Sequence, residues 1–159
     1  MLASIDDLRG IITPGDLHLV VSRTTEVCTV WRRTADGGDA LLSFPMRNRT
    51  VDEGDGHWGH CPVGSYLLGA PSDCHVVSLG LHYTPVFDLD PDGPLHQDGR
   101  VGIGIHGGGT GLSDPFAPKQ GWVETEGCER VQNADNHRLV PVIRACHAAG
   151  RKAYFTVTG

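Results

Sequence analysis

Glycine is the residue that most restricts the folds open to this chain. It makes up 22 of the 159 residues, which is roughly twice its usual share in globular proteins. The glycines do not recur at every third position, which excludes a collagen-like helix. Because 39% of the residues are hydrophobic, the chain is also too apolar for a disordered low-complexity segment. We therefore expect one globular domain over residues 1–159, with its core at about residues 17–159.

The charge pattern limits the classes of partner. The 13 basic and 19 acidic residues give a formal charge of −6. The basic residues are scattered along the sequence, so nucleic acid is not an expected partner. No apolar run approaches the roughly 18 residues that a membrane-spanning helix needs, so we expect no membrane span. The first residues include early acids instead of a basic and then apolar export signal, so the sequence indicates no export route.

Residue patterns predict many short strands and one helix. Runs of β-branched and aromatic residues between turn-forming residues indicate strands at 17–23, 26–33, 40–46, 64–69, 74–82, 86–89, 101–106 and 152–158. Apolar residues at helical spacing predict a helix at about 135–149. Asp135 or Asn136 is the expected N-cap, Gly150 follows the C-terminus, and Pro141 would allow a later start. The expected fold is mainly β, sandwich-like or barrel-like, with one C-terminal helix and a closing strand.

Cys128 differs from the other cysteines in its surroundings. The five cysteines are an odd number at unequal spacings, so they do not form a disulfide framework and at least one is unpaired within the chain. Cys28 and Cys146 fall in apolar patterns that indicate packing. Cys128 lies in a polar stretch after Gly127, which permits a tight turn, and before Arg130, which favours a thiolate. On this local pattern Cys128 is either a reactive nucleophile or a structural thiol.

His106 is the best placed base among the nine histidines. A cysteine nucleophile needs a base that meets it in space, at any distance along the sequence. His106 ends the strand expected at 101–106, and three glycines follow it and leave its ring uncovered. The alternative is a polar strand end whose ring faces water. We select Cys128 and His106 as the candidate nucleophile and base.

These residues resemble the signature of a known family. Residues 105–107, a glycine-rich loop and residues 125–130 (Thr-Glu-Gly-Cys-Glu-Arg) are similar to the active-site signature of the L,D-transpeptidase catalytic domain, the YkuD-like family. Residues 61–66 resemble its proline–glycine segment, and residues 133–135 with the helix and strand after them resemble its C-terminal end. The resemblance implies a YkuD-like β-sandwich or barrel-like fold.

Two features depart from that family. Glu126 stands where the family usually has histidine, and the 18 residues between His106 and Thr125 form a slightly long loop. The missing histidine is associated with the acceptor side of the site. The choice of acceptor, and of transfer or hydrolysis, therefore stays open. Neither departure removes the nucleophile or the base.

The resemblance implies acyl transfer on peptidoglycan stem peptides through a thioester on Cys128. His106 would act as general base and then as general acid, and the carbonyl of Gly107 would orient its ring. Backbone amides around Gly127 would hold the oxyanion. L,D-transpeptidation, D-amino acid exchange and L,D-carboxypeptidase activity all fit this chemistry. The resemblance implies no metal and no organic cofactor.

Four further residues are assigned to the substrate-binding region. Arg130 would support the thiolate or hold a substrate carboxylate, with an exposed salt bridge as the alternative. Trp122 and Tyr83 would line the peptide groove, or else be core or rim aromatics. Thr125 would support the turn that carries the nucleophile.

Other functions remain open on the sequence. His57, His60, Cys61, Cys74 and His75 are a candidate zinc ligand set, although their spacing matches no common zinc finger. Cys61 and Cys74 would instead form a disulfide if the protein works outside the cytoplasm. The third interpretation is a non-catalytic β-domain that binds the cell wall.

Peptidoglycan lies outside the cytoplasm, so the expected place of action is the bacterial cell envelope, either periplasmic or extracellular. The initiating Met runs into an acidic segment. For this reason we favour a phage-borne or injected antibacterial effector over a chain trimmed of its leader. An effector would bring an inhibitor protein as a further partner.

Overall fold

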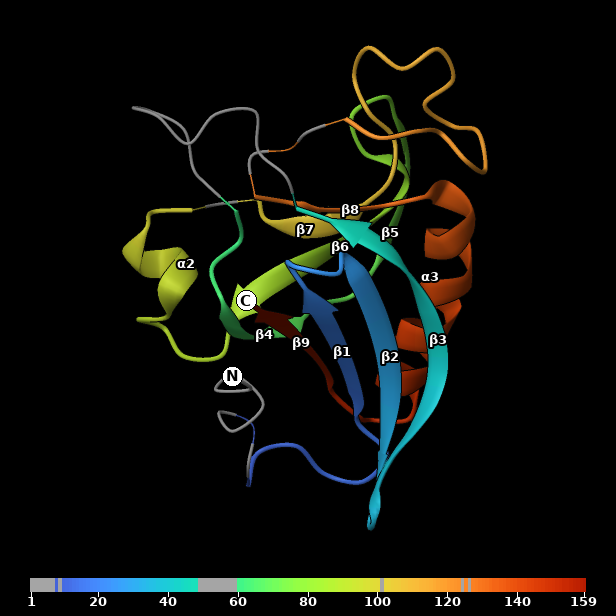
Figure 1. Cartoon of the computed structure of the whole chain (residues 1–159). Coiled ribbons are helices and arrows are strands. Elements are labelled where there is room, and N and C mark those ends of the chain that lie inside the picture. The colour runs from blue at the N-terminus through green and yellow to red at the C-terminus, as the bar shows by residue number, and fades with distance from the viewer. Residues whose placement is uncertain (1–7, 9, 49–59, 101, 124, 126) are drawn as a thin grey trace.

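The computed structural model describes residues 8, 10–48, 60–100, 102–123, 125 and 127–159, and within them the chain is mainly β (Figure 1). The strands are β1 (Leu17–Ser22), β2 (Val27–Thr34), β3 (Gly37–Arg47), β4 (Gly64–Leu68), β5 (Ser72–Val76), β6 (Gly80–Asp88), β7 (Gly104–His106), β8 (Glu129–Val131) and β9 (Ala153–Thr158). The helices are α2 (Pro94–Gln97) and α3 (Asn133–Ala148). The predicted mainly β fold with a C-terminal helix and a closing strand is confirmed.

The sheet of the described residues closes on itself. Its strand order is β4-β9-β1-β2-β3-β8-β7-β6-β5, and β4 also pairs with β6, so every strand except β5 belongs to a ring. Within the ring β1 is parallel to β9, with Leu17 opposite Ala153, and antiparallel to β2. This ring is the barrel-like arrangement that the many short strands predicted.

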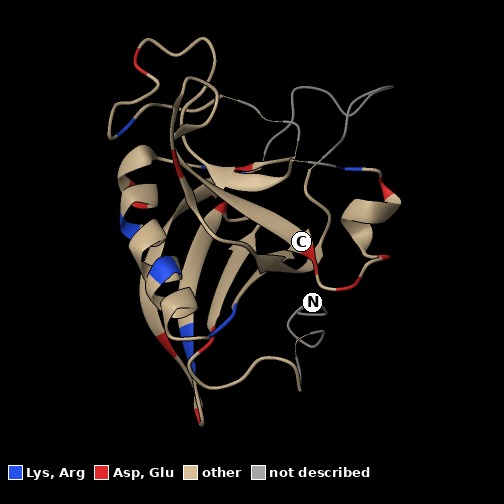
Figure 2. Cartoon of the chain, turned by 180° about the vertical axis from the view of Figure 1, so that it is seen from behind, with Lys and Arg blue, Asp and Glu red and all other residues tan. Residues whose placement is uncertain are grey.

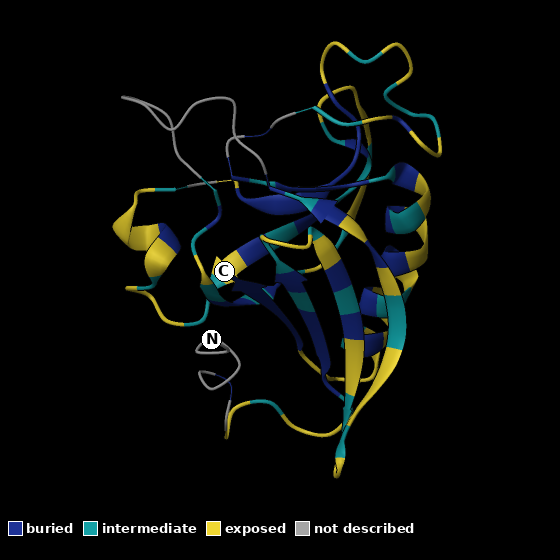
Figure 3. Cartoon of the chain, viewed as in Figure 1, coloured by how far each residue is buried: buried dark blue, intermediate teal, exposed yellow. Residues whose placement is uncertain are grey.

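The hydrophobic core lies inside this ring. Leu17, Leu19 and Val21 alternate along β1 and are at most 2% exposed, as the two-residue period of a strand requires. The helix α3 packs on β6 and β9 and buries Leu139 and Ile143 completely. Each large apolar side chain buried in this way contributes about 1.5–3 kcal/mol. Figure 3 shows the buried residues gathered in the strands and the exposed ones at the β2–β3 tip and in the loops.

One of the predicted strands is in fact a hairpin. The sequence predicted strands at 74–82 and 86–89, but the chain forms β5, reverses between Val76 and Gly80, and continues through Pro85 as β6. Gly80 has a φ of +75°, which glycine adopts without steric cost. Because the residues at this reversal are apolar, strand propensity alone did not indicate a turn there.

The helix α3 begins earlier than the sequence predicted. Its first residue is Asn133, so the expected N-cap residues Asp135 and Asn136 lie inside it, as does Pro141. The backbone N–H of Asn133 donates a hydrogen bond to Oε1 of Gln120 at 2.7 Å. The backbone N–H at the start of the helix is therefore bonded by a side chain from a distant loop, in place of a local N-cap side chain. Gly150, with a φ of +73°, follows the C-terminus as predicted.

Two short elements, α2 and β8, were not predicted. The four-residue α2 is held beside the end of β6 by Asp88. Its carboxylate accepts hydrogen bonds from the backbone N–H groups of Leu95 at 3.0 Å and His96 at 2.8 Å, which satisfies donors in the first turn of the helix. The three residues of β8 are too few to show a period.

The charged residues of the described chain are distributed over several elements. In Figure 2 the basic residues are spread over α3 and the strands, with acidic residues between them. Among the described residues, no helix combines the length and the hydrophobicity that crossing a membrane would need.

Candidate active site

The strand register places four predicted site residues on one face of the sheet. β7 and β8 are parallel, with His106 opposite Arg130, and β6 is antiparallel to β7, with Tyr83 opposite His106. Residues that pair across strands share a face, and so do residues two apart along a strand. Cys128 lies directly before β8 and two residues before Arg130, so continued alternation puts it on the face of His106. That the two act as nucleophile and base stays a prediction.

The thiol of Cys128 faces the segment that leads into β7. Its Sγ donates a hydrogen bond to the carbonyl oxygen of Gly102 at 3.4 Å. The hydroxyl of Thr125 donates to the backbone carbonyl of Cys128 at 2.7 Å, so Thr125 supports the turn before the nucleophile. Gly127 in that turn is buried and has a φ of +99°, a conformation that favours glycine.

The thiol of Cys128 needs a base at neutral pH. Burial raises the pKa of this thiol, and the Glu129 carboxyl adds to the shift, whereas a backbone hydrogen bond from Gly104 and the charge of Arg130 lower it. Arg130 thus lowers the pKa of the thiol, as expected, but burial raises this pKa by more. A thiol with a raised pKa is protonated at pH 7, so attack on a carbonyl requires a group that removes the proton.

His106 is buried, and one of its nitrogens is held by the backbone. It is 3% exposed, so the alternative of a ring that faces water is wrong. Nδ1 donates a hydrogen bond to the carbonyl oxygen of Gly107 at 2.8 Å, which leaves the lone pair on Nε2. Burial lowers the pKa of His106 to about 4; the bond to Gly107 opposes this shift and the charge of Arg130 adds to it. At neutral pH the ring is therefore uncharged and able to accept a proton.

Arg130 holds the backbone that orients the base. Its residue is 4% exposed, so an exposed salt bridge is wrong. Nη1 donates to the carbonyl of Gly107 at 3.0 Å and also to the carbonyl of Gly108. The Gly107 oxygen therefore accepts hydrogen bonds from both His106 and Arg130. Contact between Arg130 and a substrate carboxylate stays a prediction.

The loop after the base packs closely on the start of α3. A Cβ on Gly107 would lie 2.1 Å from Oδ1 of Asn133, a distance that no side chain tolerates. Nδ2 of Asn133 donates to the carbonyls of Pro115 and Ala117, both at 2.8 Å. One amide side chain thus ties the loop to the helix. Because these segments lie far apart along the chain, local sequence patterns do not predict this contact.

The two aromatics expected in the groove lie in different places. Tyr83 stacks beside His106, with ring centroids 6.1 Å apart, and a Cβ on Gly104 would lie 2.4 Å from its Cζ. The ring of Tyr83 therefore lies over Gly104. Burial raises the pKa of Tyr83 to about 12, and the nearby thiol of the candidate nucleophile contributes. Trp122 instead contacts Arg47 of β3, whose Cζ is 4.4 Å from the centroid of the indole ring.

A buried carboxyl lies behind the nucleophile. Glu129 is 0% exposed, because alternation turns it to the face opposite Cys128. Burial raises the pKa of Glu129 to about 8, while the Asn48 amide and the charge of Arg23 act against the shift. Sequence reasoning did not select Glu129. No local sequence pattern indicated its burial, because β8 is too short to show a period.

The alternative disulfide between Cys61 and Cys74 is not formed in the structure. All five cysteines are free, and Sγ of Cys74 donates to the carbonyl of Gly80 at 3.5 Å instead of bonding to Cys61. Within the described ranges, no group of three His, Cys, Asp or Glu residues could hold a metal ion. His57 of the candidate zinc set and Glu126 lie outside the described residues.

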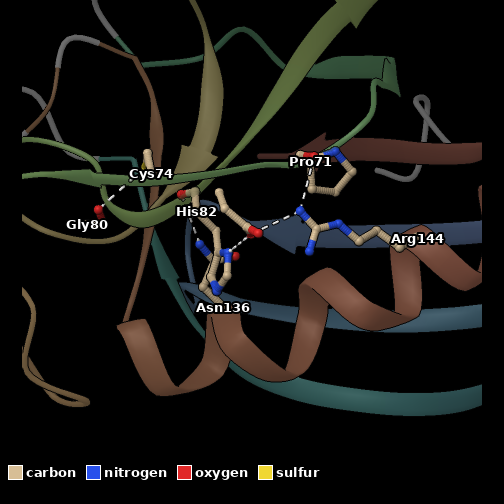
Figure 4. Close-up of polar contacts among 7 residues, drawn as sticks. Pro71, Cys74, Gly80, His82, Asn136 and Arg144 are labelled. Atoms are coloured by element: carbon tan, nitrogen blue, oxygen red, sulfur yellow. Dashed lines mark hydrogen bonds and ion pairs between the residues drawn. The ribbon is translucent and has the colours of Figure 1, made fainter.

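A second polar cluster joins the β5–β6 hairpin to α3 (Figure 4). Asp73 accepts hydrogen bonds from Nδ1 of His82 and Nη2 of Arg144, both at 2.9 Å. Nδ2 of Asn136 donates to the backbone carbonyl of His82 at 3.3 Å. His82 precedes Tyr83 on β6 and so points to the opposite face. These hydrogen bonds fasten the hairpin to the helix.

The fold resembles those of solved bacterial proteins. No family model matches the sequence, and no curated protein gives a significant match. The chain matches the helical cell shape determining protein Pgp2 from Campylobacter jejuni with a TM-score of 0.61 and 18% identity over 89% of its length. It matches Bd1075 from Bdellovibrio bacteriovorus with a TM-score of 0.57 and 14% identity over 88% of its length. The similarity defines a shared fold, and this chain spans 46% of the length of either protein.

A structure of L,D-transpeptidase 1 from Mycobacterium tuberculosis also matches. Its TM-score is 0.47, with 12% identity over 90% of this chain and 61% of the transpeptidase. Scores in this range are too low to carry an argument about function.

Proposed function

We propose that the chain catalyses cysteine-dependent acyl transfer on peptidoglycan stem peptides, as an L,D-transpeptidase-like enzyme. The observation that carries the proposal is the arrangement on β7 and β8. Cys128 and a neutral His106 lie on one face, and Nδ1 of His106 is bonded to the Gly107 carbonyl at 2.8 Å. A protonated thiol and a neutral imidazole with a free nitrogen are the groups that general-base activation of cysteine needs.

The proposed reaction has two halves. Nε2 of His106 takes the thiol proton, and Sγ of Cys128 attacks the carbonyl before a D-residue of the stem peptide. Amides around Gly127 hold the oxyanion. The C–N bond then breaks, the imidazolium gives its proton to the leaving amine, and a thioester remains. An amine or water attacks the thioester, its proton passes to His106 and then to the departing thiolate, and the enzyme is restored.

The substrate class is supported by two observations. The segments around His106 and Cys128 are similar to the L,D-transpeptidase signature. The fold is shared with Pgp2, a protein described as determining helical cell shape, and bacterial cell shape is maintained by peptidoglycan. The place of action follows from the substrate: the cell envelope, reached either as an exported enzyme or as an effector with an inhibitor protein as partner.

The test is incubation of the protein with tetrapeptide muropeptides, with and without a free D-amino acid. Mass spectrometry follows the products and the intact protein. We expect a thioester adduct on Cys128, with loss of the terminal D-residue in water or its exchange when a D-amino acid is supplied. Cys128→Ala removes both adduct and product. Cys74→Ala, the matched control at another partly exposed thiol, keeps them. Unchanged muropeptides under all conditions contradict the proposal, as does full activity in Cys128→Ala.

A further inference from the structure

A groove begins beside the candidate nucleophile and follows β6 away from it. Its volume is about 570 Å³, and its lining includes Tyr83, Pro85 and Phe87 of β6 together with Arg100 and Gly102. The carbonyl of Gly102 is the hydrogen-bond acceptor of Cys128 Sγ, at 3.4 Å. An acyl group attached to Sγ would therefore start at one end of this groove.

The wall formed by β6 is apolar and ends in an exposed aromatic ring. Tyr83, Pro85 and Phe87 are two residues apart, so they share the face of the candidate site. Phe87 is 53% exposed. One edge of its ring rests on Gly69, where a Cβ would lie 2.6 Å from Cε2. The ring is thus seated on backbone and still exposes more than half of its surface. Asp90, three residues after Phe87 along the chain, also lines the groove and is exposed.

The length of the groove matches a stem peptide with a sugar at its end. Phe87 comes four positions after Tyr83, which is about 13 Å at the rise of a β-strand. The reacting carbonyl of a tetrapeptide stem belongs to its third residue, and three extended residues span roughly 10 Å. The sugar that carries the stem follows directly after them. A donor lying along β6 from Cys128 would therefore bring its sugar to Phe87.

We propose that this groove binds the acyl donor along β6 and that Phe87 and Asp90 form a saccharide subsite for the sugar that carries the peptide; this inference rests on the proposed function. The apolar C–H face of a pyranose buries surface against an aromatic ring. A carboxylate beside the ring accepts hydrogen bonds from sugar hydroxyls. Phe87 and Asp90 supply this pair of groups.

The experiment compares two donors, a disaccharide-tetrapeptide and the same tetrapeptide without sugar. For Phe87→Ala we expect kcat/KM to fall about tenfold with the disaccharide-tetrapeptide and to stay unchanged with the free tetrapeptide. Phe87→Trp should retain the preference for the sugar-bearing donor. Trp31→Ala is the matched control, because Trp31 is an exposed aromatic (37%) on β2, outside this groove. Equal losses with both donors, or no loss with either, overturn the subsite.

A binding measurement separates this inference from the proposed function. In the Cys128→Ala background, calorimetry should give tighter binding of the disaccharide-tetrapeptide than of the free tetrapeptide. The additional change Phe87→Ala should remove that difference, by about tenfold in Kd. If wild-type protein turns over neither donor but this difference in Kd is present, the subsite holds and the catalytic proposal fails. If both donors bind equally to Cys128→Ala, the saccharide subsite fails whatever the activity.

Discussion

Two histidines on neighbouring strands have opposite environments. His106 on β7 is 3% exposed, and its Nδ1 donates to a backbone carbonyl that also accepts a bond from Arg130. His82 on β6 donates to the carboxylate of Asp73, which also binds Arg144. A carboxylate partner is the feature usually sought around a catalytic histidine. Here the histidine with the carboxylate joins a hairpin to a helix, and the one with the carbonyl is the candidate base.

The surroundings of an imidazole therefore decide its role more than the type of its hydrogen-bond partner does. Burial keeps His106 neutral, and its backbone partner fixes which nitrogen is free. The side chain of Asp73 at the other cluster is 69% exposed, where ion pairs contribute little. Three predictions follow from this contrast, in order of expected size.

The largest expected effect is on catalysis. His106→Gln should lower kcat/KM for tetrapeptide muropeptides by about 10²–10⁴-fold, because a general base contributes that much. His82→Gln should leave kcat/KM within about twofold of wild type, because its ring points to the opposite face of the sheet. The measurement is the initial rate of release of the terminal D-residue. Equal losses in the two variants would break the comparison.

A second effect is expected on the pH dependence of stability. The pKa of His106 is lowered to about 4 in the folded state, below its ordinary value of about 6.5. The unfolded chain therefore binds more protons as the pH falls, and stability that is complete above about pH 6.5 is lost towards pH 4. Between pH 7 and 4.5, this part is about 2 kcal/mol.

Urea denaturation at pH 7 and 4.5 measures this loss. The difference in unfolding free energy between the two pH values should be smaller in His106→Gln than in wild type, and close to wild type in His82→Gln. His18, whose pKa burial also lowers to about 4, adds the same kind of pH dependence to all three proteins. A difference unaltered by His106→Gln would show that the ring is not buried as a neutral group.

The smallest effect concerns two arginines. Arg130→Met removes a cation that lowers the pKa of His106, so the acid limb of the pH profile of kcat/KM should move to higher pH. Arg144→Met, at the exposed cluster, should leave that limb in place. The profile is recorded from pH 4 to 8 with each variant. A limb that stays fixed in Arg130→Met would assign the low pKa of His106 to burial alone.

Local sequence patterns were sufficient to predict features that depend on a single element. Runs of β-branched and aromatic residues located β1, β2 and β9. The polar setting of Cys128 and the glycines after His106 selected the candidate nucleophile and base. The missed features depend on tertiary contacts. Gln120 satisfies the start of α3 from a loop, the reversal before Gly80 carries apolar residues, and β8 is too short to show a period. Glu129 could be placed only once the register of β8 was fixed.

The pairing of β1 with β9 has a consequence for how the protein is made. β9 is the last described strand, and it lies between β4 and β1 with Leu17 opposite Ala153. During synthesis β1 and β4 leave the ribosome long before the strand that joins them, so neither the ring nor its core can close until β9 has been synthesised. Contacts between residues so far apart along the chain also slow folding. The nascent chain therefore exposes core strands until β9 emerges, which makes it a natural client for chaperones.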